Sequence, residues 1–205
     1  FSSNEQYNFG GAVYLDAQSI TTTERVLNCT FNNCSAKYGG GFYVYCKDSG
    51  PGDDYRVQIN QCNFTGCSSE VEGGAISSGI KDGNLTKGDN DMSISNCFFV
   101  ECVSQVGGAI YFQDGTSLGD EQTYIQSCQF INCFAKGGEG FAISSRSYKF
   151  SLSSSTFKEH NQGNQENCCI VYIETNEDEV EPELWACKFT DNSGSSSLIL
   201  NVSQS

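Results

Sequence analysis

Proline, methionine, histidine and positive charge are all scarce in this chain of 205 residues. It contains 2 Pro, 1 Met, 1 His and 1 Trp, and its 11 Lys and Arg face 25 Asp and Glu, which gives a net charge of −14. Because nucleic acids and anionic membrane surfaces bind clustered Lys and Arg, we expect neither as a partner. The sequence also has no apolar run of about 18 residues, so we expect no membrane-spanning helix.

Glycine, cysteine and aromatic residues are abundant by contrast. The chain has 22 Gly, 12 Cys, 14 Phe and 10 Tyr, enough apolar material to form a buried core. It begins with Phe1 rather than Met, and no signal peptide is visible. We therefore expect a single domain over residues 1–205 that is a fragment or a processed part of a longer chain.

A repeat of 27 to 35 residues extends over the whole sequence. Each unit is marked by a Phe, and in most units a Gly pair follows it, as in Gly73-Gly74-Ala75-Ile76. A β-branched residue or Leu precedes the Phe by five positions, as Ile94 precedes Phe99. The marker residues are Phe1, Phe31, Phe64, Phe99, Phe130, Phe157 and Phe189.

Each unit contains three short apolar segments with the two-residue period of a β-strand, and the phase breaks between them as at a corner. Three strands and three corners in one unit describe a coil of a stacked solenoid. The sequence thus predicts an all-β fold, a right-handed parallel β-helix of about seven coils of roughly 30 residues. The alternative is a β-propeller, but its blades are longer than these units. We expect an internal ladder of Phe31, Phe64, Phe99, Phe130, Phe157 and Phe189.

Eight of the cysteines form four C-x-F-x-x-C units, and His160 is the single histidine. We expect disulfides that brace the coils rather than a zinc site, which usually enlists His. The bonds could close each unit or join equivalent cysteines of stacked coils, because stacked Cα atoms lie within the range of about 4.4–6.8 Å that a disulfide needs. Cys187 is expected to pair with Cys168 or Cys169. The candidates are Cys29, Cys34, Cys46, Cys62, Cys67, Cys97, Cys102, Cys128, Cys133, Cys168, Cys169 and Cys187.

Five Asn-x-Ser/Thr sequons are candidate glycosylation sites. Together with the cysteines they favour an extracellular or cell-surface location. The sequon residues are Asn28, Asn33, Asn63, Asn84 and Asn201.

Acidic residues gather in the segments that follow the Gly-pair strands, at 53–54, 89–91, 120–121 and 174–183. They predict a solvated negative edge, with calcium as the other interpretation, and no further cofactor is expected. A β-helix lyase needs Arg or Lys beside a metal, and a glycosidase needs two carboxylates about 5–10 Å apart. Glu159 over Asp191 is the nearest pair, so we predict no catalytic residues. An acid-plus-Arg cluster on one strand face over two or three coils would favour an enzyme.

The Gly-Gly-Ala-Val/Ile motif at 10–13, 73–76 and 107–110, together with Phe-x-x-Asn at 1–4 and 189–192, resembles the repeats of the polymorphic outer-membrane-protein family of chlamydiae. Cys34, Cys67, Cys102 and Cys133 replace that Asn elsewhere. The resemblance implies a surface-exposed parallel β-helix with an adhesive or surface-building role.

The function expected from these features is that of a structural and interaction module, either a fibre subunit or an adhesin segment that assembles head-to-tail. Its partners would be further copies of itself or more of the same chain, and also glycans or host surface molecules. A carbohydrate-active β-helix enzyme, of the polysaccharide lyase or glycosidase type, is the alternative.

Overall fold

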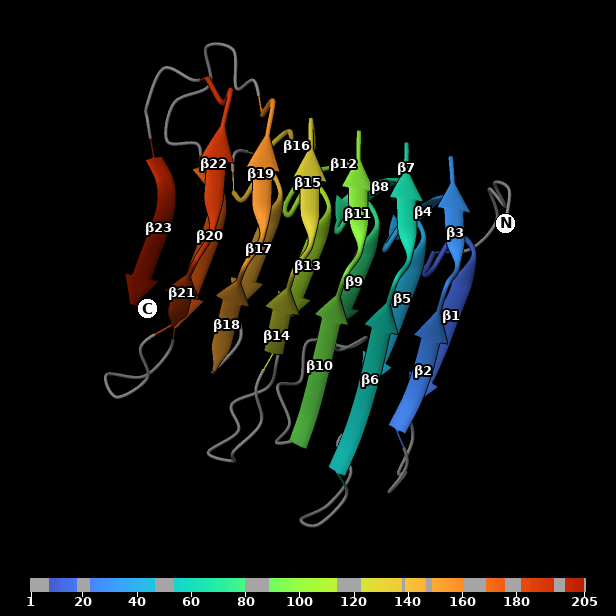
Figure 1. The fold of residues 1–205 in the computed structure, drawn as a ribbon. Helices are drawn as coiled ribbons and strands as arrows, with labels where there is room; N and C mark the ends of the chain where they lie inside the picture. The colour runs from blue at the N-terminus through green and yellow to red at the C-terminus, as the bar shows by residue number, and fades with distance from the viewer. Residues whose placement is uncertain are drawn as a thin grey trace.

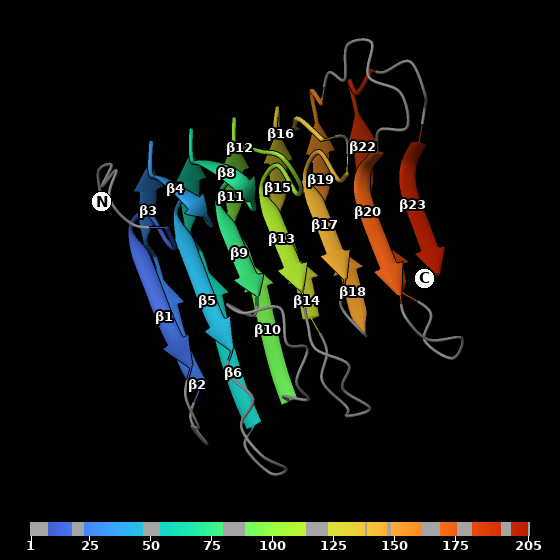
Figure 2. The same ribbon diagram turned by 180° about the vertical axis from the view of Figure 1, so that it is seen from behind.

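The structure is a computed structural model that describes residues 8–17, 23–46, 54–79, 89–113, 123–137, 139–146, 149–160, 169–175, 182–193 and 198–204. These ranges form a rod of stacked parallel strands (Figures 1 and 2). No helix within them is long and apolar enough to cross a membrane.

Four parallel sheets run along the rod. The long sheet contains β1 (Val13–Ala17), β5 (Phe42–Cys46), β9 (Ile76–Gly79), β13 (Ile110–Gln113), β17 (Ile143–Arg146), β20 (Cys169–Thr175) and β23 (Leu198–Gln204). The front sheet, nearest the viewer in Figure 1, contains β2 (Thr23–Leu27), β6 (Asp54–Asn60), β10 (Asp89–Ser95), β14 (Thr123–Gln126), β18 (Phe150–Ser153) and β21 (Glu183–Trp185).

The other two sheets are built from shorter strands. The ladder sheet contains β3 (Thr30–Asn32), β7 (Asn63–Thr65), β11 (Phe98–Val100), β15 (Gln129–Ile131), β19 (Thr156–Lys158) and β22 (Lys188–Thr190). The short sheet contains β4 (Ser35–Tyr38), β8 (Ser68–Glu72), β12 (Val103–Ser104) and β16 (Phe134–Ala135).

The predicted parallel β-solenoid is confirmed, with differences in the number and the make-up of its coils. About four coils are complete, because the short sheet has only four strands, against the roughly seven coils expected. The stack continues beyond the complete coils, because the front sheet extends to β21 and the ladder sheet extends to β22. A complete coil has four strands rather than three. The fourth was missed because segments such as Ser35–Tyr38 are short and carry little apolar periodicity.

The phenylalanine ladder is confirmed at every position within the described ranges. Phe31, Phe64, Phe99, Phe130 and Phe157 have no exposed surface. Neighbouring rings are stacked with centroids 4.5 to 5.1 Å apart and planes within 10° of parallel, up to and including Phe189. Parallel pairing in register places each ring over the next, as in Phe64 over Phe99. Phe1 lies outside the described residues.

Left-handed backbone conformations make the corners of each coil. One precedes the ladder-sheet strand, as at Asn96 (φ 52°), and one follows it, as at Glu101 (φ 53°). A third lies at a glycine such as Gly73 (φ 61°), where a Cβ would come within 2.0 Å of the carbonyl oxygen of Ile76. This close approach explains why the repeat requires glycine there. In the fifth unit Gly140 (φ 63°) makes the corner, and Phe141 follows it.

Candidate functional site

The cysteines of the repeat form two columns along the rod, all of them buried except the partly buried Cys29. Each follows a left-handed corner residue and points inward. The first thiol column contains Cys29, Cys62, Cys97 and Cys128, and the second contains Cys34, Cys67, Cys102 and Cys133. Within the described ranges none of ten cysteines, Cys169 and Cys187 included, forms a disulfide, so the expected disulfides are not present there. Cys168 lies outside these ranges, and for Cys46 the structure describes the backbone alone.

The first thiol column joins successive coils through hydrogen bonds. The Cys62 Sγ lies 3.4 Å from the backbone nitrogen of Cys29 and 3.3 Å from the carbonyl oxygen of Asn60. Ser155 occupies the same place in a later coil, where its hydroxyl accepts from the backbone nitrogen of Cys128 (3.1 Å) and donates to the Ser153 carbonyl (2.8 Å). A serine can therefore replace cysteine, because this position needs a small side chain that both donates and accepts.

The second thiol column shows why Cys and Asn interchange in the Phe-x-x-Asn motif. The Sγ of Cys102 lies 3.7 Å from the Phe64 carbonyl oxygen in the preceding coil. The Asn192 side chain makes the equivalent bond, donating from Nδ2 to the Phe157 carbonyl at 3.1 Å. His160 ends the run of thiols, with Nδ1 3.2 Å from the Asn192 Oδ1. Both residue types close the same corner by donating to the coil before.

The thiols contact one another along each column. If disulfides form, these contacts favour bonds between neighbouring coils over bonds within one C-x-F-x-x-C unit. A hydrogen bond with Cys128 raises the pKa of Cys97 to about 12. A hydrogen bond with Cys97, together with burial, raises the pKa of Cys62 above its usual range. Because the thiolate is the reactive form, Cys62 and Cys97 are poor nucleophiles once the chain is folded.

The described sequon residues are exposed at the surface. Asn28 and Asn33 lie at left-handed corners, and Asn63 begins β7. Asn84 lies outside the described residues, and for Asn201 the structure describes the backbone alone. Glycosylation stays a prediction that the exposure of the first three residues permits.

The acidic segments fall largely outside the described residues, so the calcium interpretation is not tested there. Among the residues that are described, no group of three or more His, Cys, Asp or Glu could hold a metal ion. Glu159 and Asp191 are exposed corner residues, and Glu159 forms an ion pair with Lys158 at 2.7 Å. The pair that the sequence placed nearest together therefore lies at exposed corners of the rod.

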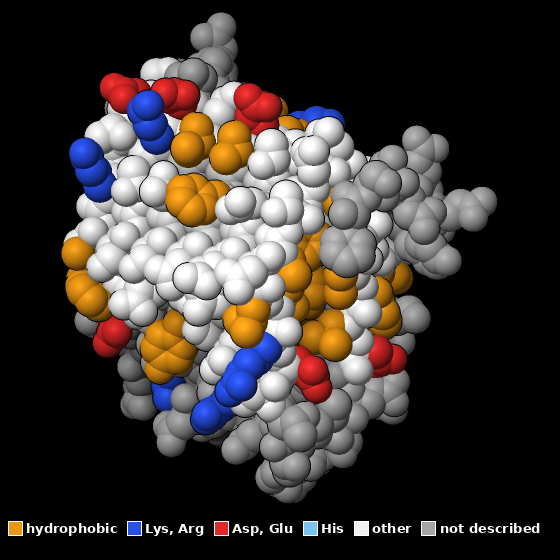
Figure 3. Space-filling model, turned by 45° about the vertical axis from the view of Figure 1, so that its right-hand side comes forward, with side chains coloured by type: hydrophobic (Ala, Val, Ile, Leu, Met, Phe, Trp, Pro, Cys, Tyr) orange, Lys and Arg blue, Asp and Glu red, His pale blue; other side chains and the backbone are white. Residues whose placement is uncertain are grey.

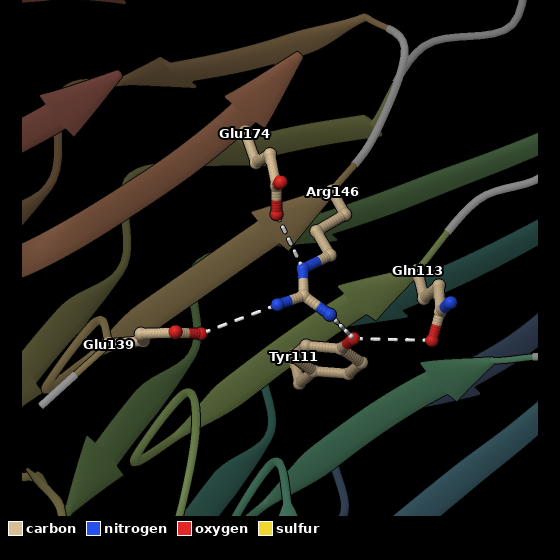
Figure 4. Close-up of polar contacts among 5 residues, drawn as sticks. All are labelled: Tyr111, Gln113, Glu139, Arg146 and Glu174. Atoms are coloured by element: carbon tan, nitrogen blue, oxygen red, sulfur yellow. Dashed lines mark hydrogen bonds and ion pairs between the residues drawn. The ribbon is translucent and has the colours of Figure 1, made fainter. Parts of the chain in front are cut away.

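A polar cluster lies on the outward side of the long sheet, around Arg146 (Figure 4), and includes the buried Tyr111. Its Nε lies 2.7 Å from the Glu174 carboxylate, and one terminal nitrogen lies 3.5 Å from that of Glu139. The other terminal nitrogen donates to the Tyr111 hydroxyl at 3.3 Å, which in turn donates to Gln113 at 3.2 Å. We call these five residues the Arg146 cluster.

Parallel register brings the Arg146 cluster together from three coils. Gln113 on β13 pairs with Arg146 on β17, and Tyr111 on β13 pairs with Ser144 on β17. The tyrosine side chain therefore reaches diagonally across one coil to the guanidinium. The Ser144 hydroxyl is buried and has no hydrogen-bond partner among the residues that the structure describes. A small residue at position 144 leaves room for this crossing.

Glu72, two coils before Glu139 and likewise next to a corner glycine, lies near the same cluster. Burial raises the pKa of Glu72, while the nearby Arg146 acts in the opposite direction. Burial and the charge of Glu72 also raise the pKa of the Tyr111 hydroxyl above its usual range. The cluster thus combines a guanidinium, carboxylates and a protonated phenol.

Sequence reasoning did not place Arg146 beside carboxylates. One feature of the sequence could have aligned Arg146 with Gln113 on neighbouring strands. Gln113 and Arg146 each lie six residues after a corner glycine, at Gly107 and Gly140. The acid-plus-Arg cluster sought as a mark of an enzyme is therefore present, across three neighbouring coils.

Comparison with known proteins gives no relative: no family model, no curated protein and no solved structure matches this chain.

Proposed function

We propose that this chain is a structural and interaction module of an extracellular or cell-surface protein, built from repeats of the polymorphic outer-membrane-protein type. The observation that carries the proposal is the filled interior: the phenylalanine ladder and the buried apolar residues beside it, such as Ile94 and Ile110, occupy the inside of the rod. Function then falls to the outer faces and to the two ends of the stack, which is how solenoids usually bind partners.

The ends of the described stack support head-to-tail assembly. At the first coils Val13, Leu15 and Val26 belong to the core but are only partly buried, and Leu184 and Phe189 are likewise partly buried at the last coil. A further coil, from the same polypeptide or from a neighbouring copy, would cover these side chains and pair with the outermost strands. Contacts of this heterologous kind propagate into filaments.

We also propose right-handed winding, the usual hand of parallel crossovers.

We further propose that the cysteines of each column form disulfides between neighbouring coils in an oxidising compartment. A small-molecule disulfide would be the oxidant, and it would take up the two hydrogens that each pair of thiols loses as its S–S bond forms. Each column has four consecutive cysteines, so only one arrangement joins neighbours and leaves none over. The pairs are Cys29–Cys62, Cys97–Cys128, Cys34–Cys67 and Cys102–Cys133.

Sedimentation velocity over a range of concentrations tests the assembly. The chain should form larger species as concentration rises, and Val26→Asp, at the partly buried core edge, should suppress them. Leu27→Asp is the matched control, because Leu27 is the next residue along β2 but points outward and is 48% exposed. A monodisperse monomer at every concentration, or equal effects of the two variants, would contradict the proposal. Circular dichroism shows that each variant is folded.

A carbohydrate-active enzyme is the second candidate function, and the Arg146 cluster is the observation that favours it. Incubation with neutral and acidic polysaccharides, followed by assays for new reducing ends and for unsaturated products, tests this activity. Glu139→Gln and Arg146→Gln should abolish any activity, whereas Glu70→Gln, an exposed residue on β8, should preserve it. Activity that survives the first two substitutions would exclude the cluster as its source.

A further inference from the structure

Two columns of outward-pointing residues on the front sheet carry no charge over four consecutive strands. Charged residues border them: Arg56 is exposed on β6, Arg25 donates to Gln58 at 3.2 Å, and Glu183 accepts from Ser151 at 3.5 Å. Outward-pointing residues alternate with core residues such as Val57, Ile94, Ile125 and Leu152, and strand pairing aligns them in two columns. On β18 the outward-pointing serines are buried as well. From β6 to β18 the aligned outward residues are Gln58, Ser93, Tyr124 and Ser151 in one column and Asn60, Ser95, Gln126 and Ser153 in the other. We call this surface the amide–hydroxyl face.

The adjoining corner extends this uncharged surface into a third column. Its left-handed residues are Gln61, Asn96, Ser127 and Ser154. The columns are linked laterally, since Asn96 donates to the Asn60 side chain at 3.2 Å. In Figure 3 the middle of this side of the rod is a broad white area, with acidic and basic side chains toward its upper and lower margins.

The absence of charge within these columns restricts the chemical class of ligand that the amide–hydroxyl face can bind. A nucleic acid or acidic polymer would need a basic surface, and a basic partner would favour the acidic parts of the molecule. Hydroxyl and amide side chains both donate and accept hydrogen bonds, which matches a ligand rich in hydroxyl groups. Equivalent groups recur along the rod at about 4.8 Å, the spacing of paired strands. A polymer with its own regular repeat can therefore engage successive coils in the same way.

Two exposed aromatic side chains stand on the same surface. Tyr124 on β14 is 45% exposed and Trp185 on β21 is 54% exposed. Strand pairing places Ser151 beside Tyr124 and Ser153 beside Trp185, so the serines of β18 separate the two rings. Both serines are nearly buried, at 7% and 5% exposed. Large rings beside small residues leave flat apolar surfaces open to a ligand, with polar groups next to them.

We propose that the amide–hydroxyl face, with Tyr124 and Trp185, binds an uncharged polysaccharide chain that lies along the rod. This inference rests on the proposed role as an interaction module and names its ligand class. Each neutral hydrogen bond contributes only about 0.5–1.5 kcal/mol, so binding depends on several sugar units at once. Affinity should rise with the length of the oligosaccharide and should change little with salt.

Fluorescence of Trp185 provides a direct assay, because it is the single tryptophan of the chain. The 205-residue chain is titrated with hexasaccharides and disaccharides of β-glucan, chitin and mannan, and with oligogalacturonate as the acidic probe. At least one neutral hexasaccharide should shift the emission, bind at least 10-fold more tightly than its disaccharide, and keep its affinity within about twofold between 0.05 and 0.5 M salt.

Surface variants test the location of the site by calorimetry with that hexasaccharide. Tyr124→Ala and Trp185→Ala should each lower the affinity at least 10-fold, and Gln126→Glu should also weaken binding. Phe98→Ala is the matched control, because Phe98 is an aromatic residue that is 43% exposed on the neighbouring ladder sheet. Its affinity should stay within twofold of that of the unaltered chain.

Three results would overturn the inference: no binding to any neutral hexasaccharide, binding to oligogalacturonate alone, or equal losses in Phe98→Ala and Trp185→Ala. Sedimentation of the same samples separates these results from a failure of the proposed function. A chain that assembles without binding sugar refutes this ligand assignment alone. A chain that neither assembles nor binds sugar refutes both.

Discussion

The substitutions Phe99→Ala and Phe98→Ala compare the inside and the outside of the rod at adjacent positions. Phe99 has no exposed surface and stacks between Phe64, at 5.1 Å, and Phe130, at 4.8 Å. Phe98 points outward from the same strand, β11, and is 43% exposed. The two variants remove the same atoms, so the difference between them measures the ladder itself.

The expected magnitude follows from burial and stacking. Truncation of a buried Phe to Ala costs about 3–5 kcal/mol, and loss of two ring contacts places Phe99→Ala in the upper part of that range. For a chain of this size 1 kcal/mol shifts the melting temperature by about 2–4 °C, so about 4 kcal/mol lowers it by about 8–16 °C. An exposed substitution usually changes stability by less than about 0.5 kcal/mol, which predicts a shift under about 2 °C for Phe98→Ala.

Thermal unfolding followed by far-ultraviolet circular dichroism measures both variants against the unaltered chain. Repetition at several protein concentrations removes any contribution from assembly. Equal shifts for Phe98→Ala and Phe99→Ala, or a shift below about 2 °C for Phe99→Ala, would refute the ladder as the main source of stability.

Three further predictions concern the corners, the thiols and Glu72. Gly73→Ala should lower the free energy of unfolding in urea by more than about 2 kcal/mol, because the φ of Gly73 is 61° and the new Cβ would meet the Ile76 carbonyl. Gly79→Ala is the control and should change that free energy by less than about 1 kcal/mol, because the nearest atom to its new Cβ, the Tyr43 hydroxyl, lies at 3.4 Å. Cys97→Ser should cost less than about 1.5 kcal/mol in reducing buffer, since Ser155 makes the equivalent bonds, and a much larger loss there would reject the hydrogen-bonding role. Glu72 has a raised pKa, so its contribution to stability is full below about pH 4.3 and is lost as pH rises through the folded-state value. Glu72→Gln should thus unfold at higher urea than the unaltered chain at pH 8, with the gap closing toward pH 4; a pH-independent difference would contradict this.

The fold was predictable because each marker of the repeat reports a backbone constraint that recurs in most coils. Phe in constant phase with the Gly pair predicts one inward column, and stacking follows from parallel pairing. Left-handed corners are visible in the sequence as breaks in the two-residue period. The strands of the short sheet have no comparable marker: β12 contains only Val103 and Ser104, of which Ser104 is the buried residue. Two residues cannot display a period.

The Arg146 cluster was less predictable, since it depends on how side chains cross between coils. Tyr111 and Arg146 are 35 residues apart and occupy different positions in their strands. They meet because the tyrosine extends over Ser144, whose small size is meaningful only when the neighbouring coil is known. A periodic sequence therefore reveals what stacks directly, whereas contacts along a diagonal need the coordinates.

The cysteine columns show how one regular pattern can satisfy two different constraints. Regular spacing suggests disulfides, yet the structure gives the thiols a hydrogen-bonding role that Ser155 and Asn192 perform in other coils. That role requires a small donor at the corner, and serine or asparagine would serve it in any compartment. The two runs of four consecutive cysteines exceed what that role requires. The disulfides proposed above would account for them, since stacked residues lie about 4.8 Å apart and within the span of a disulfide. Because Cys62 and Cys97 are buried and have raised pKa values, oxidation of the first thiol column would have to occur while the coils are still forming.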